Sequence, residues 1–197
     1  MTTTDTPPAA EDRGRSPYSA REKIARVLWA AVQGTLFRYS FHNWYRWRRF
    51  LLTRFGARLH PVVRIRRTVS VECPWNLAMG RESSAGDGVI LYCLGPVCIG
   101  DRVSISQHAH ICAGSHDHTR PDLPLTRPPI TIEDDAWIAT DAFVGPGTTV
   151  GRGAILGARG CAFKDLASWT IYGGNPAKPI RTREPFDSDQ QQAPTAP

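Results

Sequence analysis

Aliphatic residues recur at every sixth position through much of this chain, and that period restricts the possible folds more than any other feature. The series runs through Ile99, Ile105, Ile111, Ile132, Ile138, Val144, Val150 and Leu156. A period of six matches neither the 3.6-residue repeat of a helix face nor the two-residue alternation of a simple strand. It is typical of hexapeptide repeats, in which short strands turn corners and stack on the preceding coil. The sequence therefore predicts a mainly β fold, a parallel β-helix.

Two interruptions of the period divide the predicted β-helix domain, which we place at residues 57–183. A weaker upstream series runs through Leu59, Ile65, Val71 and Leu77. It loses phase before Ile99, where the segment 86–96 would add four residues. A longer break follows Ile111, and the proline-rich segment 116–130 is expected to leave the coil as a loop. Loops extruded from a regular scaffold commonly carry functional residues.

The segments that flank this domain have different compositions. Residues 1–19 are rich in Thr, Pro, Asp and Arg, and residues 184–197 in Gln, Pro and Ala, so we expect a disordered leader and a disordered tail. Residues 20–56 are expected to form a helical arm in which aromatic residues alternate with arginines. Two roles for the arm stay open. Its aromatics pack on the β-helix, or residues 21–55 make peripheral contact with a membrane, for which Trp beside Arg is suited.

The net charge of +6 is concentrated near the N-terminus. Residues 1–70 contain 14 Lys/Arg and 4 Asp/Glu, a net +10, whereas residues 71–197 contain 10 and 14, a net −4. A basic segment attracts membrane phosphate or nucleic acid, but no nucleic-acid-binding motif is present, so we expect no nucleic-acid partner. The longest uncharged stretch of the arm, residues 27–37, is too short to span a bilayer.

The cysteines and the N-terminal sequence bear on location. The five cysteines are odd in number and show no CxxC pair, which favours a reducing compartment. The polar N-terminus lacks the apolar region of a signal peptide. We therefore expect a cytoplasmic protein, located at the inner face of the membrane if the arm binds lipid.

Four of the six histidines, His108, His110, His116 and His118, are clustered, and their HxH spacing resembles that of metal ligands. If three hexads make one coil, six residues turn the chain by about a third of a revolution, so His110 and His116 point apart. Residues about 18 apart stack instead, which would pair His116 with the region of Cys98. We therefore favour a single general base, His116, where the last regular hexad meets the extruded loop, and we expect no metal.

Four motifs resemble those of the hexapeptide-repeat O-acetyltransferases. They are Ile-Cys-Ala-Gly-Ser-His-Asp at 111–117, Pro-Ile-Thr-Ile-Glu-Asp-Asp-Ala-Trp-Ile at 129–138, Val-Gly-Pro-Gly-Thr-Thr-Val-Gly at 144–151 and Gly-Asn-Pro-Ala-Lys-Pro-Ile-Arg at 174–181. Ile-Ser-Gln at 105–107 and Trp-Arg-Arg-Phe at 47–50 are most similar to the colanic-acid-type exopolysaccharide acetyltransferases within that group. The resemblance covers about residues 21–183. It implies a left-handed β-helix that forms a homotrimer with active sites between subunits, acetyl-CoA as donor and a sugar or glycolipid hydroxyl as acceptor.

The resemblance also implies roles for individual residues. His116 matches the catalytic histidine, which would take the proton of the acceptor hydroxyl as its oxygen attacks the thioester. The residues that match cofactor contacts are Trp137 at the wall of the cleft, Thr140 and Ala158 beside the pantetheine arm, and Lys164, Lys178 and Arg181 near the CoA phosphates. Cationic side chains suit phosphate groups.

Three further residues are candidates for contacts with the acceptor. Asp87 and Tyr92 lie in the segment that we expect to approach the cleft, and Asp117 follows His116. A turn-forming role is the alternative for Asp87. The predicted function is an acetyl-CoA-dependent O-acetyltransferase of a sugar hydroxyl in exopolysaccharide biosynthesis. Two alternatives are an O-acetyltransferase of an antibiotic or other small alcohol, and a zinc-dependent β-helical hydratase.

Overall fold

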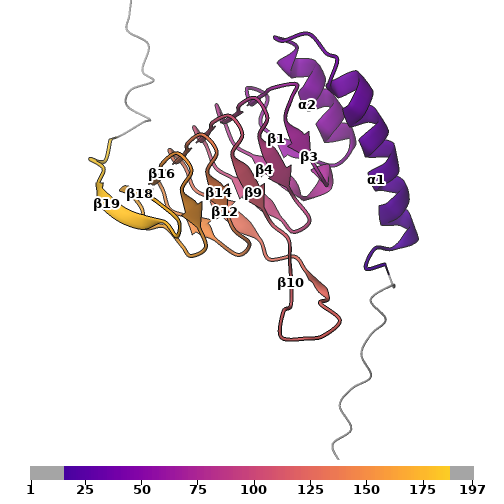
Figure 1. The fold of residues 1–197 in the computed structure, drawn as a ribbon. Coiled ribbons are helices and arrows are strands. Elements are labelled where there is room, and N and C mark those ends of the chain that lie inside the picture. Colours follow the sequence, from indigo (N-terminus) through magenta and orange to yellow (C-terminus); the bar gives the residue numbers. More distant parts are fainter. Residues whose placement is uncertain (1–15, 187–197) are drawn as a thin grey trace, which may run out of the picture.

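The computed structural model describes residues 16–186, which form a left-handed parallel β-helix with a helical arm at one end and a hairpin extruded from its side (Figure 1). The mainly β fold, the helical arm and the loop that leaves the coil are confirmed. The predictions for the leader up to residue 15 and for the tail from residue 187 concern residues outside the described range. The domain boundaries themselves stay predictions.

Three parallel sheets form the faces of the β-helix. Sheet A contains β1 (Arg58–Leu59), β4 (Leu77–Met79), β7 (Val97–Ile99), β12 (Ile130–Ile132) and β15 (Thr149–Val150). Sheet B contains β2 (Arg64–Ile65), β5 (Ser84–Ala85), β8 (Ser104–Ile105), β13 (Trp137–Ile138), β16 (Ile155–Leu156) and β18 (Thr170–Gly173), and ends on the antiparallel β19 (Lys178–Thr182). Sheet C contains β3 (Ser70–Val71), β6 (Ile90–Tyr92), β9 (His110–Cys112), β14 (Phe143–Val144) and β17 (Cys161–Ala162). We name the turns between the faces the A–B, B–C and C–A corners.

The six-residue series marks the side chains that point into the coil. In sheet B, Ile105, Ile138 and Leu156 stack above one another and are buried. Each coil therefore adds one layer of aliphatic side chains to a continuous core. The backbone N–H and C=O groups of these stacked parallel strands are satisfied, because they bond to the coils above and below.

The coils differ in length, and this corrects the predicted position of the phase slip. Early coils repeat every 20 residues, as in Ile65 beside Ala85, and later ones every 18, as in Ile138 beside Leu156. The two extra residues of each early coil lie at the C–A corner, within 72–78 and 92–98. The first of these turns contains a 3-10 helix, Pro74–Asn76. The prediction of one four-residue insert at 86–96 is wrong, because two separate corner turns share the extra residues.

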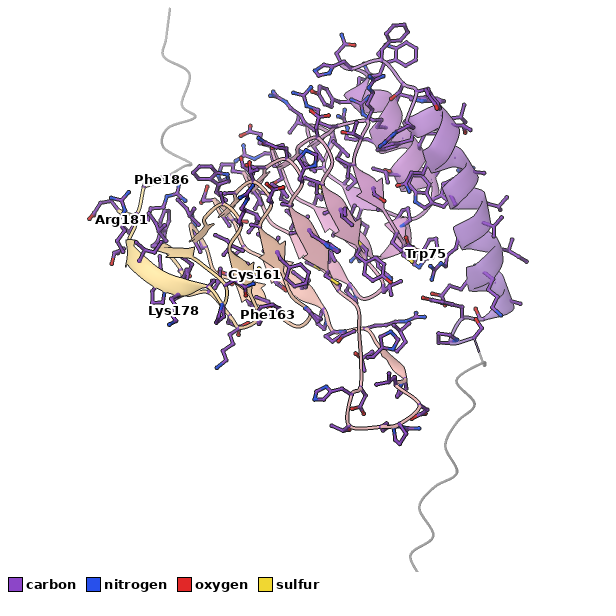
Figure 2. The ribbon with its side chains drawn as sticks, viewed as in Figure 1. Trp75, Cys161, Phe163, Lys178, Arg181 and Phe186 are labelled. Carbon is purple, nitrogen blue, oxygen red and sulfur yellow. The ribbon has the colours of Figure 1, made fainter. Side chains whose placement is uncertain are left out.

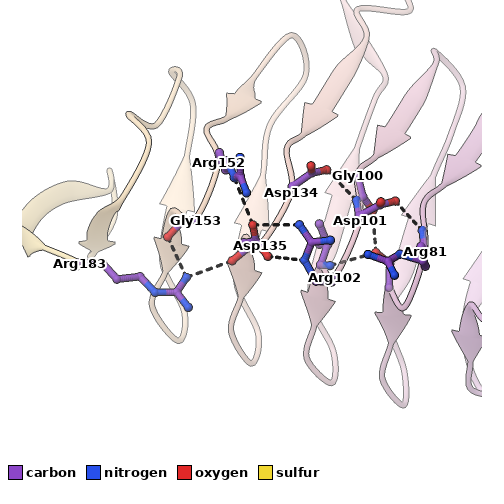
Figure 3. A network of polar contacts seen from close by, with 11 residues as sticks. Arg81, Gly100, Asp101, Arg102, Asp134, Asp135, Arg152, Gly153 and Arg183 are labelled. Atoms are coloured by element: carbon purple, nitrogen blue, oxygen red, sulfur yellow. Dashed lines mark hydrogen bonds and ion pairs between the residues drawn. The ribbon is translucent and has the colours of Figure 1, made fainter. Parts of the chain in front are cut away.

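Polar side chains form a ladder along the A–B corner (Figure 3). The buried Asp135 pairs with Arg102 at 2.7 Å and with Arg152 at 3.2 Å, and so joins three coils. Arg183 donates to the Asp135 carbonyl at 3.0 Å and to the Gly153 carbonyl at 2.8 Å. These ion pairs and hydrogen bonds link neighbouring coils along the A–B corner. The residues predicted to take part in binding or catalysis lie outside this corner.

The helical arm closes the first coil. It consists of α1 (Ala20–Val32), a π-helical turn (Gln33–Phe37) and α2 (Tyr45–Arg54). The indole of Trp29 donates to the Val71 carbonyl at 2.6 Å, and the Val71 N–H donates to the Gln33 side chain at 2.6 Å. The arm thus satisfies backbone groups on a strand edge that would otherwise be open to pairing with another chain.

One face of the arm packs and another stays exposed. Trp29, Phe37 and Leu52 join the core, which confirms the packing role for part of the arm. The exposed large apolar side chains of the arm are Ile24, Val27, Leu28, Leu36, Tyr39, Phe41, Trp44 and Phe50. Among residues 16–186, none of the helices has the length and hydropathy needed to cross a bilayer.

Candidate active site

The chain leaves the coil after β9 and forms a hairpin at the C–A corner, made of β10 (Ser115–His116) and β11 (Leu125–Thr126). His116 pairs with Leu125 in antiparallel register, and the next N–H, that of Asp117, donates to the Pro124 carbonyl at 3.0 Å. The hydrogen-bonded hairpin extends away from the β-helix, as β10 shows in Figure 1, and His116 within β10 is exposed.

This hairpin corrects one register prediction. The expected stacking of His116 near Cys98 is wrong, since Cys98 pairs with Ala78 and Thr131 in sheet A. His116 belongs to a separate two-stranded sheet, so the hexad arithmetic does not apply to it.

The imidazole of His116 has one nitrogen committed to the hairpin. Nδ1 lies 2.6 Å from the Leu123 carbonyl oxygen. A carbonyl oxygen accepts and never donates, so Nδ1 carries the hydrogen of the neutral ring and Nε2 keeps its lone pair. The geometry therefore presents Nε2 of an exposed histidine as a proton acceptor.

The Asp117 carboxylate forms hydrogen bonds within the hairpin loop and does not orient His116. Its carboxylate accepts hydrogen bonds from the Thr119 N–H at 3.0 Å and the Thr119 hydroxyl at 2.6 Å. These hydrogen bonds from Thr119 lower the pKa of the Asp117 carboxyl. Asp117 is thus held as a carboxylate in the residue next to His116.

The structure separates Tyr92 from Asp87. Tyr92 ends β6 on the coil next to the hairpin, and a Cβ placed on Gly114 would lie 2.9 Å from its ring. Asp87 lies at the other end of β6, at the B–C corner, where it accepts a 2.7 Å hydrogen bond from the Thr68 hydroxyl and lies 3.8 Å from Arg66. Tyr92 therefore borders the base of the hairpin, whereas Asp87 does not.

Three of the predicted cofactor contacts follow sheet B and the B–C corner. Trp137 is half exposed on the outer face of β13, and its indole N–H donates to the Ser106 hydroxyl at 2.9 Å. Thr140 and Ala158 occupy equivalent turns of successive coils, linked by the Arg159 N–H, which donates to the Thr140 carbonyl at 2.9 Å. This row lies on the far side of sheet C from His116 in the same chain.

The predicted phosphate contacts gather at the C-terminal end of the β-helix. Lys164 borders a pocket of about 300 Å³ whose wall includes Phe163, Tyr172 and Ala177. Lys178 and Arg181 are exposed on β19, at the end of the molecule farthest from the arm (Figure 2). Trp137 lies on sheet B, and Lys178 and Arg181 lie on β19, so a single chain does not place these three residues on the hairpin that carries His116.

Two of the other clustered histidines, His108 and His110, have structural positions. His108 takes a left-handed turn conformation with φ 61°, and His110 lies between the rings of Tyr92 and Phe143 in edge-to-face contacts. Burial lowers the pKa of His110. Among residues 16–186, no three His, Cys, Asp or Glu side chains come together in a way that could hold a metal.

The sequence analysis does not predict two features of the site. The carbonyl of Leu123 that fixes His116 is a backbone group, which any residue supplies. A row of rings along the outer face of sheet C, running from His110 through Phe143 to Phe163, is the other. The outward positions of hexads do reveal such a row once the coil repeat is known.

Comparison with known proteins shows which proteins this chain is similar to. No family model matches the sequence. The colanic acid biosynthesis acetyltransferase WcaF of Escherichia coli K12 is 46% identical over 156 residues, which cover 79% of this chain and 86% of that protein. A chloramphenicol acetyltransferase of Agrobacterium fabrum is 50% identical over 58 residues, 29% of this chain.

Solved structures share the fold. A maltose O-acetyltransferase from Clostridium difficile 630 superposes with a TM-score of 0.74 at 22% identity, covering 85% of this chain and 92% of that one. A hexapeptide-repeat acetyltransferase from Vibrio cholerae has a TM-score of 0.76 at 24% identity, covering 85% and 95%.

The fold and the relatives define a hexapeptide-repeat acetyltransferase. At 46% identity over most of both chains, the protein belongs to the family of the acetyltransferase WcaF. It is therefore an acyltransferase.

Proposed function

We propose that this protein transfers the acetyl group of acetyl-CoA to a sugar hydroxyl, on a sugar or glycolipid intermediate of exopolysaccharide biosynthesis. The observation that carries the proposal is the hydrogen bond between His116 Nδ1 and the Leu123 carbonyl, which leaves Nε2 available as a base. The relative WcaF, described as a colanic acid biosynthesis enzyme, supports the polysaccharide context. The Vibrio cholerae structure solved in complex with acetyl-CoA, which shares the fold with a TM-score of 0.68, supports the donor.

The proposed reaction has a simple proton path. The acceptor hydroxyl oxygen attacks the thioester carbon while its proton moves to His116 Nε2. The tetrahedral intermediate then collapses, the C–S bond breaks and the imidazolium returns the proton to the CoA sulfur. The products are an acetyl ester and free CoA. No covalent enzyme intermediate is required, because holding both substrates together supplies much of the rate.

The donor contacts are part of the same proposal. Trp137 would wall the pantetheine channel, and the backbone at Thr140 and Ala158 would bond to the pantetheine amides. Neither Thr140 N–H nor Ala158 N–H makes a hydrogen bond within the described chain, so both can donate to a ligand. Lys164, Lys178 and Arg181 would meet the phosphates. Tyr92 and Asp117 are the better placed acceptor contacts, and Asp87 would act only across a subunit boundary.

We also propose a homotrimer whose active sites lie between subunits. His116 lies at the C–A corner and Trp137 on sheet B, so one chain does not contain a complete site. Phe163 is exposed beside the half-buried Phe143 of sheet C, and a neighbouring subunit would cover both rings.

Mixing two disabled variants tests the shared site. His116→Ala and Trp137→Ala proteins, each impaired alone, should regain about a quarter of wild-type activity when mixed subunits reassemble, since a quarter of the interfaces would carry both intact residues. A mixture as inactive as its components, although it forms mixed oligomers, would contradict a site built from two subunits.

We further propose that the arm makes peripheral contact with the inner face of the cytoplasmic membrane. Residues 20–70 contain 12 Lys/Arg and a single acidic residue, Glu22, and this charge complements anionic lipid. Ile24, Val27 and Leu28 form an exposed apolar stripe on α1. An amphipathic helix flanked by cations is suited to lie at such an interface.

Vesicle binding tests this contact with two matched substitutions. Val27 is 68% exposed on α1, and Ile180 is 67% exposed on β19 at the opposite end of the molecule. Val27→Glu should weaken binding to vesicles that contain phosphatidylglycerol by about tenfold, because it removes apolar burial and adds repulsion. Ile180→Glu should not. Equal effects, or equal binding to neutral phosphatidylcholine vesicles, would contradict the arm as the contact.

Acetyl transfer itself is tested with a panel of acceptors. Thiol release from acetyl-CoA is followed with sugar nucleotides, undecaprenyl-linked sugars and chloramphenicol, and the acetyl ester is identified by mass spectrometry. We expect a sugar to be acetylated. Acetylation of chloramphenicol in preference to every sugar would favour the antibiotic alternative, and CO₂ hydration without thiol release would favour the hydratase.

A further inference from the structure

The helical arm is joined directly to the hairpin that carries His116. Arg127 follows β11 on the return limb of the hairpin, and its guanidinium lies 3.1 Å (Nη1) and 3.4 Å (Nη2) from the two carboxylate oxygens of Glu22 in the first turn of α1. Glu22 and Arg127 are 105 positions apart in the chain. Arg-carboxylate pairs of this two-pronged kind are geometrically specific as well as charged.

The pair is part of a larger cluster. The Arg127 guanidinium lies 5.2 Å from the ring centroid of Tyr18, just before α1, and that of Arg26 lies 4.1 Å from the same ring. Arg26 also pairs with Glu72 on the first coil. The start of α1 is thereby fixed to the β-helix on one side and to the hairpin on the other.

The local sequence leaves Glu22 free for this contact. Ser19 caps α1, and its hydroxyl accepts the Glu22 N–H at 3.2 Å. A glutamate at this third helical position often reaches back to the cap residue. Here both of its carboxylate oxygens face Arg127, while its negative charge still favours the helix N-terminus.

The hairpin limb that Arg127 anchors is the limb that orients the base. Leu123, whose carbonyl holds His116 Nδ1, lies four residues before Arg127 on the same limb. Gly95 allows this limb to lie against the β-helix, because a Cβ there would be 2.5 Å from the Arg127 carbonyl oxygen. The return limb thus packs closely on the turn at Gly95 and is paired with Glu22 through Arg127.

We propose that Glu22 is a positioning residue for His116: through Arg127 it orders the return limb and so keeps the Leu123 carbonyl on Nδ1. This inference rests on the proposed function for its catalytic consequence. It makes the arm a support of the active hairpin in addition to a cap on the first coil.

The test compares two charge-neutralising substitutions on opposite sides of the same cluster. Glu22→Gln releases Arg127, whereas Glu72→Gln releases Arg26 and leaves the Glu22–Arg127 pair intact. Glu22→Gln should lower kcat about fivefold with the KM for acetyl-CoA unchanged, the scale of one well-formed, partly exposed ion pair. Glu72→Gln should leave kcat at the wild-type value. The Arg127→Gln variant should match Glu22→Gln, and the double variant should lose no more than either single one.

Hydrogen exchange supplies a readout that does not depend on activity. Exchange of the Asp117 amide, which bonds to the Pro124 carbonyl across the hairpin, should be about fivefold faster in Glu22→Gln and unchanged in Glu72→Gln. Unchanged exchange in Glu22→Gln, additive losses in the double variant, or an equal fall of kcat in Glu72→Gln would overturn the proposal. Wild-type protein that transfers no acetyl group would instead refute the proposed function, and the exchange comparison would still decide whether Glu22 orders the hairpin.

Discussion

The arm is held to the β-helix by a buried arginine, and removing its charge should be costly. Arg48 of α2 is fully buried and donates to the Ile65 carbonyl at 2.7 Å and the Ser40 hydroxyl at 2.8 Å. It also donates to the carbonyls of Phe41 and His42, both at 2.8 Å. The last two acceptors lie near solvent, so water can replace the arginine there. The Ile65 and Ser40 acceptors are buried and would lose a partner.

Arg48→Met keeps the apolar stem and removes the donors. Each buried acceptor left unsatisfied costs about 1–3 kcal/mol, so for two acceptors we expect a loss of about 2–6 kcal/mol in the free energy of unfolding. At about 2–4 °C per kcal/mol for a chain of this size, the Tm should fall by about 4–24 °C. Urea unfolding followed by tryptophan fluorescence measures the free energy, and thermal unfolding followed by circular dichroism measures the Tm.

The neighbouring Arg49 provides the control. Its single bond, to the Val63 carbonyl at 2.7 Å, is only partly buried. Arg49→Met should therefore cost about 1 kcal/mol or less. If Arg48→Met unfolds within 1 kcal/mol of Arg49→Met, the reasoning that buried acceptors decide the cost is refuted.

Three further outcomes follow from the site. Trp137→Ala should raise the KM for acetyl-CoA about tenfold, because it removes a half-exposed ring from the proposed pantetheine wall, and an unchanged KM would exclude that contact. Gly95→Ala should lower kcat at least tenfold in soluble protein, since its Cβ would displace the Arg127 backbone at the base of the hairpin; wild-type kcat would show that the limb position does not matter. Acetyl transfer should persist after exhaustive treatment with EDTA, because a histidine base needs no metal, and loss that zinc restores would favour the hydratase-type alternative.

The hexad period was sufficient to predict the core, because it reports which side chain of each strand points inward. It could not predict the coil length. Residues within 72–78 and 92–98 pass around corners, where side-chain period gives no signal, so the phase slip was assigned to a single segment. The expected stacking of His116 on Cys98 is wrong for a different reason: His116 lies in the extruded hairpin, and Cys98 pairs with Thr131 instead.

The candidate site, like the core, was predictable from the sequence only in part. The sequence identified His116 as the candidate base, and the position of the break in the period explains why it stands outside the coils. Which nitrogen of its ring is free depends on the Leu123 carbonyl, a backbone group across a hairpin turn. The Glu22–Arg127 contact joins residues too far apart in sequence for any local pattern to connect them.

The helical arm was also predictable from the sequence only in part. Its aromatic and arginine residues indicated packing or lipid contact, and the structure uses Trp29 and Arg48 for packing. The apolar side chains left outside, among them Val27 and Phe41, are those that a membrane would cover. An amphipathic pattern alone does not distinguish the two faces, because each is apolar.

The central claim is that Nε2 of His116 accepts the proton of the acceptor hydroxyl, and the most direct test is the single-turnover rate of acetyl transfer in His116→Ala. With acetyl-CoA and the identified sugar acceptor both saturating, the variant should transfer acetyl groups about 10²-fold or more slowly than wild type, with acetyl-CoA binding unchanged by calorimetry. A variant that binds acetyl-CoA normally and transfers its acetyl group at the wild-type rate would contradict the claim.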